Sequence, residues 1–337
     1  MALLLNEEQQ YLKDTAKDFV QKNAPINRFR ELRDSEDETG YSKELWKQMA
    51  ELGCAGVLIS EEYGGSDFGM VGMGGILEET GRCLVPSPLF STALLGASLI
   101  ELGGKADQKK DLLTKIAKGE LTTAFALEEG SRHTTYRMST TAEKKGNNFV
   151  LNGKKTFVLD GHSADLIVLA ARTSGGIEDQ SGISLFLIYP HSTGLQRKRT
   201  HMVDSRNARE IHLKDVEVSE TELLGELVAG FSIIEEVLER GQIGISAEML
   251  GNTLEAFDIT LEYLKERKQF GAVIGSFQAL QHRAAVMFAE IELTKSSVMG
   301  ALNAVDENSN DRSRFASLAK FKAGETLHLV SSEAVQM

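Results

Sequence analysis

The hydrophobic period of this chain changes twice, and few folds accommodate that order. Apolar residues recur at helical spacing through residues 6–120, read as strands from 121 to about 225, and return to helical spacing from Gly230. A chain of 337 residues is long enough for two or three domains. We expect an α+β multidomain protein with an all-α domain (1–120), a middle antiparallel β-barrel or sandwich (121–228) and a C-terminal helical bundle (229–337).

The N-terminal helices carry start and stop signals. Asn6-Glu-Glu-Gln9 is a capping-like start, and residues 42–52 form an amphipathic helix that stops at Gly53. A helix of small residues is expected from about Phe68 to Gly81. Further helices are expected near 94–102 and 107–118.

The clearest hairpin signal is Asn152-Gly153, because both residues tolerate positive φ. It separates two apolar runs, 148–151 and 155–159, which we predict to be paired strands. Arg197-Lys-Arg199 lies outside the apolar runs, and we expect a loop with a solvated charged face. The other predicted strands span 165–171, 183–188 and 210–213.

The corner at residues 263–278 combines two helix ends with polar side chains. Apolar residues at helical spacing lead to Gly271, which we expect to end one helix, and Ser276 is expected to cap the next. Arg267 and Gln278 then lie on either side of the turn. A guanidinium fork matches phosphate oxygens, so the corner suits an anionic cofactor. The alternative is an ordinary helical hairpin with a solvated arginine.

The charge balance and the cysteines exclude several classes of protein. Lys and Arg number 37 against 49 Asp and Glu, a net charge of −12, which disfavours nucleic acid or an anionic membrane as a general partner. No apolar run approaches a membrane span, and the start lacks signal-peptide features. Cys54 and Cys83 are far apart, so we expect buried thiols, and the 7 histidines form no ligand-like cluster. We therefore expect a cytoplasmic protein without a metal.

Short motifs occur in a fixed order along essentially the whole chain. They are Asn6-Glu-Glu-Gln9, Glu61-Glu-Tyr-Gly-Gly65, Asn152-Gly-Lys-Lys155, Gly161, Leu223-Leu-Gly-Glu226, Gly230-Phe231, Glu266-Arg-Lys-Gln-Phe-Gly271, Phe277-Gln278 and Glu333-Ala-Val-Gln336. Each is weak alone, but the ordered set resembles the acyl-CoA dehydrogenase family. The resemblance implies the α, β, α domain order of that family, FAD as the cofactor and an acyl-CoA substrate.

The resemblance assigns the corner to FAD bound by a neighbouring subunit, with Gln336 beginning the segment that completes the site. The residues that match by position are Arg267, Gln269, Phe270, Gln278 and Gln336. Arg267 could instead pair with Glu266 or Asp258 on the surface. Phe270 could be a core anchor, and Gln278 could be only the start of a helix.

The β-domain side of the implied FAD site departs from the family pattern. Where the family has a Thr-Glu-Pro-Gly type of loop followed by Gly-Ser-Asp, this chain has Leu127-Glu-Glu-Gly-Ser-Arg-His133. Ser131 could replace one lost donor or be merely solvated. The family's Trp-Ile-Thr strand corresponds to Phe157, Val158 and Leu159. The resemblance therefore leaves the flavin an aromatic face and two backbone N–H groups.

The resemblance implies α,β-desaturation of an acyl-CoA thioester, in which a carboxylate removes the α proton while the flavin takes the hydride. In most of the family this carboxylate follows the segment that begins at Gln336, so we expect it after Met337, with the C-terminal domain incomplete in this sequence. Some members carry it near Leu238-Glu-Arg240, but Glu239 misses their spacing by two residues and could be a helix-start charge. Glu248 is expected to be structural, so the catalytic residue is unknown.

More than one function fits the resemblance. The first is an FAD-dependent dehydrogenase of lipid catabolism that passes electrons to an electron-transfer flavoprotein, assembled as a homo-oligomer, in the family a dimer of dimers. The second is a non-catalytic or FAD-site-sharing partner subunit of a hetero-oligomer, motivated by the altered 127–133 loop beside an intact corner. The third is an oxidase or flavin hydroxylase. Arg240 and residues 197–199 match the CoA phosphates only by charge, and the acyl chain is unknown.

Overall fold

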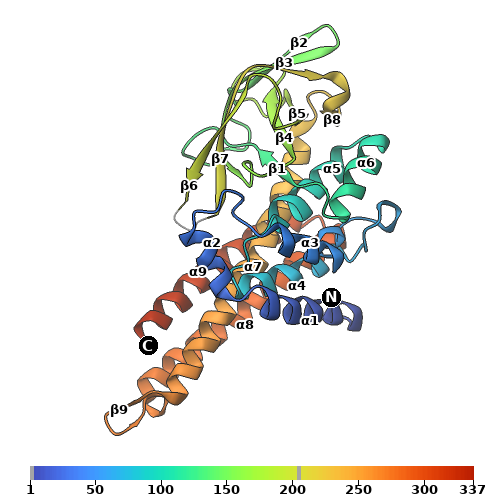
Figure 1. Cartoon of the computed structure of the whole chain (residues 1–337). Coiled ribbons are helices and arrows are strands. Elements are labelled where there is room, and N and C mark those ends of the chain that lie inside the picture. The colour runs from blue at the N-terminus through green and yellow to red at the C-terminus, as the bar shows by residue number, and fades with distance from the viewer. Residues whose placement is uncertain (1–3, 203–205) are drawn as a thin grey trace. The chain divides into compact units, whose positions relative to one another are not determined.

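The chain forms two compact units, each assembled from segments that are separate in the sequence. One combines Met1–Phe29, Phe68–Val85 and Glu239–Met337, and the other combines Arg30–Asp67 and Pro86–Leu238. The structure is a computed structural model that describes residues 4–202 and 206–337 (Figure 1). The first unit is mainly helical, and the second contains a β-sheet with short helices.

The helices of the first unit are mostly long. They are α1 (Glu7–Asn23), α4 (Gly69–Arg82), α7 (Gly230–Glu266, which begins in the second unit), α8 (Gln278–Asp306), α9 (Arg312–Gln336) and the short 3-10 helix η5 (Ile274–Ser276). The predicted capping box of α1 is confirmed, because the Asn6 side chain accepts from the Gln9 N–H at 2.8 Å and the Gln9 side chain accepts from the Asn6 N–H at 3.0 Å. In the part of the chain that the structure describes, no helix is long and apolar enough to cross a membrane.

The small residues of α4 allow α7 to cross it at backbone contact. A Cβ atom added at Gly81 would lie 2.3 Å from the carbonyl oxygen of Glu248, and one at Gly251 would lie 1.9 Å from the carbonyl oxygen of Glu78. Neither position has space for a side chain. The predicted helix of small residues is confirmed, and the crossing explains its composition.

The helices of the second unit are short. They are most of α2 (Ile26–Asp34), α3 (Lys43–Glu51), α5 (Ala97–Gly103), α6 (Ala106–Ala117), the π-helical segment η3 (Leu89–Gly96) and the 3-10 segments η1 (Cys54–Gly56), η2 (Glu61–Tyr63) and η4 (Glu220–Glu222). The Ser42 hydroxyl accepts from the Leu45 N–H at 3.2 Å and so begins α3, as the sequence predicts.

The sheet of the second unit is mixed rather than purely antiparallel. Its strands are β1 (Thr123–Ala126), β2 (Thr141–Lys145), β3 (Asn148–Leu159), β4 (Leu166–Arg172), β5 (Ile183–Ile188), β6 (Leu195–His201), β7 (Asn207–Ser219) and β8 (Leu223–Leu224). Their order is β6-β7-β3-β2-β4-β5-β8, and β1 pairs with β4. The β1–β4 and β2–β4 pairs are parallel, and the remaining pairs in this sheet are antiparallel. The predicted β domain is thus confirmed with two parallel contacts added.

The strand β4 is buried on both faces and separates two cores. Val168 and Ala170 belong to a core that includes residues of α5 and α6. Ile167 and Leu169 belong to a second core that includes residues of β3 and β7, so the sheet curls over this side. A strand covered on both faces reads as a continuous apolar run rather than an alternating one, which explains the sequence of β4.

The predicted hairpin at Asn152-Gly153 is wrong, because β3 runs straight through these residues. The turn lies earlier, where Lys145 pairs with Asn148 and Gly146 adopts a φ of 62°. Gly153 instead forms a bulge opposite β7, with a φ of 151°. A Cβ atom there would lie 2.5 Å from the Thr140 hydroxyl oxygen, so the glycine is needed for close approach within the sheet.

We expect Gly153→Ala to destabilise the protein more than Gly146→Ala. At Gly146 an added Cβ meets nothing within 4 Å, so only the backbone conformation opposes alanine, which costs about 1 kcal/mol. At Gly153 the clash with Thr140 adds to the backbone cost, and the total should reach roughly 2–4 kcal/mol. Urea unfolding of the two variants measures the difference. Equal losses would contradict the close approach.

Candidate functional site

The corner between α7 and α8 is a small β-hairpin. Strands β9 (Lys268–Gln269) and β10 (Ala272–Val273) pair antiparallel across a two-residue turn (Figure 1). Both turn residues have positive φ, 53° at Phe270 and 76° at Gly271, as a type I′ turn requires. An aromatic residue in this conformation is strained, so the hairpin holds Phe270 in place at a local cost.

Two predictions about the corner are therefore wrong. α7 ends at Glu266 rather than at Gly271, because the glycine serves the hairpin turn instead of a helix end. Ser276 does not cap α8, since its hydroxyl donates to the Val273 carbonyl oxygen at 2.7 Å. α8 begins at Gln278 without a side-chain cap.

The predicted cofactor residues of the corner all face solvent. Arg267, Gln269, Phe270 and Gln278 are exposed, and the Phe270 ring is 93% exposed. Its nearest aromatic neighbour is Phe277, at 6.3 Å between ring centroids, so Phe270 is not a core anchor. The structure thus presents a cluster of exposed polar and aromatic groups on and beside the hairpin.

The guanidinium group of Arg267 forms no ion pair among the residues that the structure describes. The predicted alternative, an ion pair with Asp258, does not occur, because the Asp258 carboxylate accepts from Arg82 at 2.9 Å. Among the residues that the structure describes, Arg267 also makes no ion pair with Glu266. Gln336 lies in the last turn of α9 and is also exposed.

A bulge in β3 sets the position of Phe157. The register against β7 shifts between Lys155 and Val158, and Phe157 has a φ of 51°. Its ring is 56% exposed, whereas the Val158 side chain is fully buried in the core. Strained residues next to bulges often mark functional sites, because bulges re-aim side chains.

The backbone N–H groups of Val158 and Leu159 point in opposite directions. The Asp160 N–H donates to the Asn207 carbonyl oxygen at 2.8 Å, and hydrogen bonds alternate along an antiparallel pair. The Val158 N–H therefore points toward β7, and the Leu159 N–H points away from it. Of the two predicted donors, Leu159 is the one that the sheet leaves available.

A buried ion pair holds the loop before β2 against β3. The Lys155 ammonium, with 0% exposure, donates to a Glu129 carboxylate oxygen at 2.8 Å and to the Leu127 carbonyl oxygen at 3.0 Å. The same carboxylate accepts from the Ser139 N–H at 2.6 Å and the Thr140 N–H at 2.9 Å. Lys155 and Glu129 thus organise the altered loop, although the sequence marked them only as parts of motifs.

Opposing forces act on the pKa values of this pair. Burial lowers the pKa of Lys155 to about 8, and the nearby Glu129 charge only partly opposes this. Burial alone would raise the pKa of Glu129, but Lys155 and the donors of Ser139 and Thr140 outweigh it and lower that pKa to about 2. Both groups are therefore charged at neutral pH.

A cavity of about 460 Å³ lies beside this loop, and this volume is within the range of small-molecule sites. Its lining residues come from the loop and from Ile177. They are Glu129, Gly130, Ser131, Arg132, Thr134, Arg137, Ser139 and Ile177. Ser131, the predicted replacement donor, therefore borders a cavity that also has two arginines.

The structure gives structural partners to both carboxylates considered as a base. A Glu239 oxygen lies 2.6 Å from the Arg312 Nε on α9, and Glu239 lies inside α7 rather than at its start, which corrects the expected helix-start charge. Glu248 is 7% exposed and lies where α4 and α7 cross. The catalytic base is therefore not assigned to either residue.

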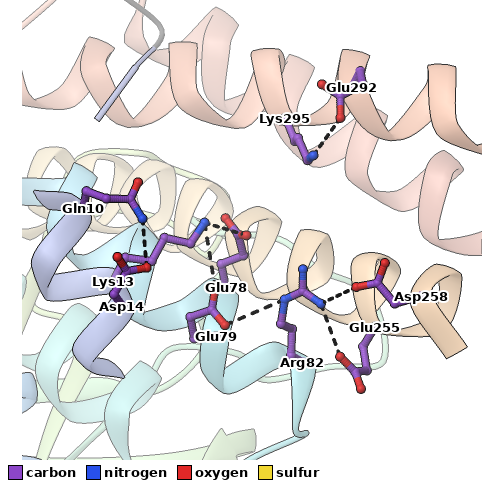
Figure 2. A network of polar contacts seen from close by, with 10 residues as sticks. All are labelled: Gln10, Lys13, Asp14, Glu78, Glu79, Arg82, Glu255, Asp258, Glu292 and Lys295. Carbon is purple, nitrogen blue, oxygen red and sulfur yellow. Dashed lines mark hydrogen bonds and ion pairs between the residues drawn. The ribbon is translucent and has the colours of Figure 1, made fainter. Parts of the chain in front are cut away.

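Charged residues of the first unit form a separate network (Figure 2). Lys13 on α1 lies 2.7 Å from Glu78 on α4, and Arg82 on α4 lies 3.2 Å from Glu255 and 2.9 Å from Asp258 on α7. The network borders a cavity of about 520 Å³ whose apolar lining includes side chains of α4, α7 and α8. Because opposite charges meet across the helices, we interpret this network as a link between helices.

Comparison with known proteins identifies the family. Its profiles match residues 6–120 (acyl-CoA dehydrogenase, N-terminal domain), 124–216 (middle domain) and 229–337 (C-terminal domain). The probable acyl-CoA dehydrogenase YngJ of Bacillus subtilis is 32% identical over 99% of this chain and 88% of YngJ. Subunit CarC of the caffeyl-CoA reductase-Etf complex of Acetobacterium woodii is 31% identical over 99% of this chain and 89% of CarC.

Solved structures agree with the sequence comparisons. Butyryl-CoA dehydrogenase from Megasphaera elsdenii has a TM-score of 0.91 and 28% identity, covering 100% of this chain and 89% of that one. The chain belongs to the acyl-CoA dehydrogenase family of FAD-using oxidoreductases, and acyl-CoA dehydrogenation is the activity that these relatives support for it. The predicted family and fold class are thus confirmed.

We expect Glu129→Gln to lower the free energy of unfolding by about 3 kcal/mol, because the fully buried Lys155 ammonium loses its counter-charge. The matched control is Glu128→Gln. Glu128 pairs with the exposed His133, so its loss should cost at most about 1 kcal/mol. Denaturant unfolding at pH 7 measures both. Similar small losses in the two variants would show that the buried pair contributes little.

The acid stability of the protein should also depend on Glu129. Its folded pKa is lowered from 4.5 to about 2, so its contribution is present above pH 4.5 and lost as the pH falls toward 2. Glu129→Gln should therefore lose less stability than the unaltered protein between pH 5 and about pH 3. Unfolding curves across this range test the sign, and a steeper loss in the variant would contradict it.

Proposed function

We propose that this protein is an FAD-dependent acyl-CoA dehydrogenase that binds the cofactor through the residues assigned by position. The observation that carries the proposal is the Arg267 guanidinium, which is exposed and without a side-chain partner among the described residues. A hairpin with a strained turn follows it directly. Such a group is suited to an anionic ligand, because a guanidinium fork matches phosphate oxygens.

The residues on the β side fit a flavin in their chemistry. Phe157 offers an exposed ring on a bulge, and Leu159 offers an N–H that the sheet does not use. On the helical side, Arg267, Gln269, Phe270, Gln278 and Gln336 would contact the FAD of a neighbouring subunit. All five are exposed in one chain, as residues that meet a second chain must be.

When bound, the flavin supplies the acceptor for the hydrogen that leaves the β carbon of the thioester. The chain's own part is to orient the acyl-CoA, exclude water and remove the α proton with a carboxylate whose pKa is raised by a dry pocket. Glu239 is unsuited to this role, because its carboxylate is held by Arg312, with 2.6 Å between an oxygen and the Nε atom.

Several further features belong to the same proposal. The three family profiles support three consecutive domains, 1–120, 121–228 and 229–337. A homotetramer is supported by the corner, which would serve a site on a second chain. The CarC relative belongs to an Etf complex, which supports an electron-transfer flavoprotein as the redox partner. The free thiols of Cys54 and Cys83 fit a reducing compartment such as the cytoplasm, and an acyl-CoA substrate fits lipid catabolism.

A second candidate is a partner subunit that lends the Arg267 corner to an active relative and holds no flavin itself. It is favoured by the 127–133 loop, which lacks the family's Thr-Glu-Pro order and is held instead by Glu129 and Lys155. The ratio of flavin to protein separates the candidates. One flavin per chain in the purified protein excludes the partner-subunit candidate.

The activity itself can be tested by anaerobic titration of the flavin-loaded protein with acyl-CoA thioesters of increasing chain length. We expect at least one thioester to bleach the visible flavin absorbance, because the reduced flavin loses its absorption near the oxidised maximum. Adding an electron-transfer flavoprotein should restore it. If no thioester bleaches a fully loaded protein, the dehydrogenase proposal fails.

We expect Arg267→Ala to weaken FAD binding by about 10- to 100-fold, because it removes charge-assisted hydrogen bonds to the pyrophosphate. Lys268→Ala is the matched control, since Lys268 is the adjacent exposed cation on β9. Calorimetry with FAD on the flavin-free protein measures both affinities. Equal losses in the two variants would indicate a general charge effect, and unchanged binding in Arg267→Ala would overturn the assignment.

A further inference from the structure

The charged run Arg197-Lys-Arg199 forms part of strand β6 rather than the predicted loop. Side chains alternate along a strand, so Arg197 and Arg199 share one face and Lys198 lies on the other. Arg197 and Arg199 are half-buried, whereas Lys198 is exposed. The run is therefore not a uniformly solvated face, and two of its guanidinium groups are directed against the protein.

Arg199 lines a cavity of about 430 Å³ that lies wholly within the second unit. Its walls come from the segment before α3, from the residues after β3 and from strands β6 and β7. The lining residues are Glu38, Thr39, Lys43, His162, Ser163, Arg199 and Arg209. The Asn207 amide donates to the Thr39 carbonyl oxygen and so joins the segment before α3 to the start of β7.

The guanidinium groups around the cavity are held by backbone carbonyl oxygens rather than by carboxylates. Arg199 donates to the Asp37 carbonyl oxygen at 2.8 Å, and Arg209 donates to the Arg197 carbonyl oxygen at 2.8 Å. Arg197 donates to the His162 carbonyl oxygen at 3.1 Å. In the described ranges, 4–202 and 206–337, none of the three arginines forms an ion pair. Backbone carbonyl oxygens therefore fix the orientation of these guanidinium groups, and no described carboxylate is bonded to them.

Two buried nitrogen atoms at the cavity also lack a hydrogen-bond partner among the described residues, Nδ1 of His162 and Nε of Arg209. Unsatisfied buried polar atoms are costly and call for a ligand or water. Burial lowers the pKa of His162 to about 4, with further lowering by Arg209, Arg199 and Arg197. Burial also lowers the pKa of Arg209, and the neighbouring arginines add to this. The positive charges thus repel one another.

The carboxylates nearby offset only part of the positive charge of this cluster. The Asp37 carboxylate accepts through Oδ1 from the Thr39 N–H at 2.8 Å and from the Gly40 N–H at 2.7 Å, and its charge raises the pKa of His162 less than burial and the three arginines lower it. Glu38 is an exposed residue of the lining, which also contains the exposed cation Lys43. The balance of the lining is positive, which favours an anion.

We propose that this cavity binds the phosphate group of a small phosphorylated metabolite, held by Arg199 and Arg209 with His162. Guanidinium groups fixed in orientation match the oxygens of a phosphate. A phosphate alone would leave much of the 430 Å³ empty, so the volume leaves room for an organic group of nucleoside size. The site is distinct from the Arg267 corner and from the loop at Glu129, and it does not depend on the proposed redox function.

The test uses the full chain saturated with FAD, so that the redox site is occupied. Calorimetry measures binding of inorganic phosphate, adenosine 5′-monophosphate and adenosine at constant ionic strength, with sodium chloride as the salt control. We expect adenosine 5′-monophosphate to bind more tightly than inorganic phosphate, and adenosine and chloride not to bind. If the nucleotide binds no more tightly than inorganic phosphate, the proposal that the cavity also holds an organic group is wrong. If neither inorganic phosphate nor the nucleotide binds, the proposed phosphate site is wrong.

Variants locate the binding. Arg199→Gln and Arg209→Gln should each weaken phosphate binding at least 10-fold, because each removes charge-assisted hydrogen bonds. Lys198→Gln, on the opposite face of β6, should stay within twofold of the unaltered protein. Lys43→Gln provides a second test if an arginine variant does not fold, because Lys43 is an exposed residue of the cavity lining. This variant should weaken phosphate binding about 2- to 5-fold. A loss in Lys198→Gln as large as in Arg199→Gln overturns the assignment.

The His162 imidazole gives a second readout. A bound phosphate favours the imidazolium form, so it should raise the pKa of His162 from about 4 toward its ordinary value of 6.5. Proton NMR titration with and without phosphate measures this, with His162→Gln to assign the signal. An unchanged pKa at saturating phosphate would show that the anion binds elsewhere.

Discussion

The Lys155 ammonium has no access to water, so the protein around it must supply each of its favourable contacts. It finds them in the Glu129 carboxylate and the Leu127 carbonyl oxygen. The same carboxylate also accepts hydrogen bonds from the N–H groups of Ser139 and Thr140, so one buried charge holds the loop before β2 against β3. The bulge that exposes Phe157 begins directly after Lys155. The β side of the candidate site therefore depends on this ion pair for both its loop and its strand.

Local sequence signals succeeded where the side chain and the backbone it binds lie close together in the chain. The Asn6–Gln9 capping box needs only four residues, and its signal was sufficient. The hairpin predicted at Asn152-Gly153 was wrong because these residues permit either a turn or a bulge. Which of the two forms depends on contacts with Thr140 and β7. The prediction that Gly271 ends a helix was wrong for a similar reason, since a left-handed glycine can end a helix or close a hairpin. The ordered motifs still identified the fold, because they extend over the whole chain.

The candidate site was only partly accessible to sequence reasoning. Arg267 could be selected by position, but the pairing of Asp258 with Arg82, which engages the carboxylate expected beside Arg267, joins residues 176 positions apart. Glu129 and Lys155 were missed as a pair, because the apolar surroundings that make a buried charge informative are not visible in a motif. Arg197 and Arg199 were placed in a loop, since strand β6 carries too few apolar residues to show the period of a strand. In each case the missing information was tertiary.

The crossing at Gly81 and Gly251 joins segments from the two ends of the chain. α1 and α4 belong to the same compact unit as residues 239–337, whereas the second unit is drawn from residues 30–238. During synthesis from the N-terminus, α4 leaves the ribosome long before α7 exists to cover its small-residue face. The β-containing unit can complete its contacts first, and the helical unit must wait for its last helices. A nascent chain of this protein should therefore expose α4 for much of its translation, which makes α4 a natural point for chaperone contact.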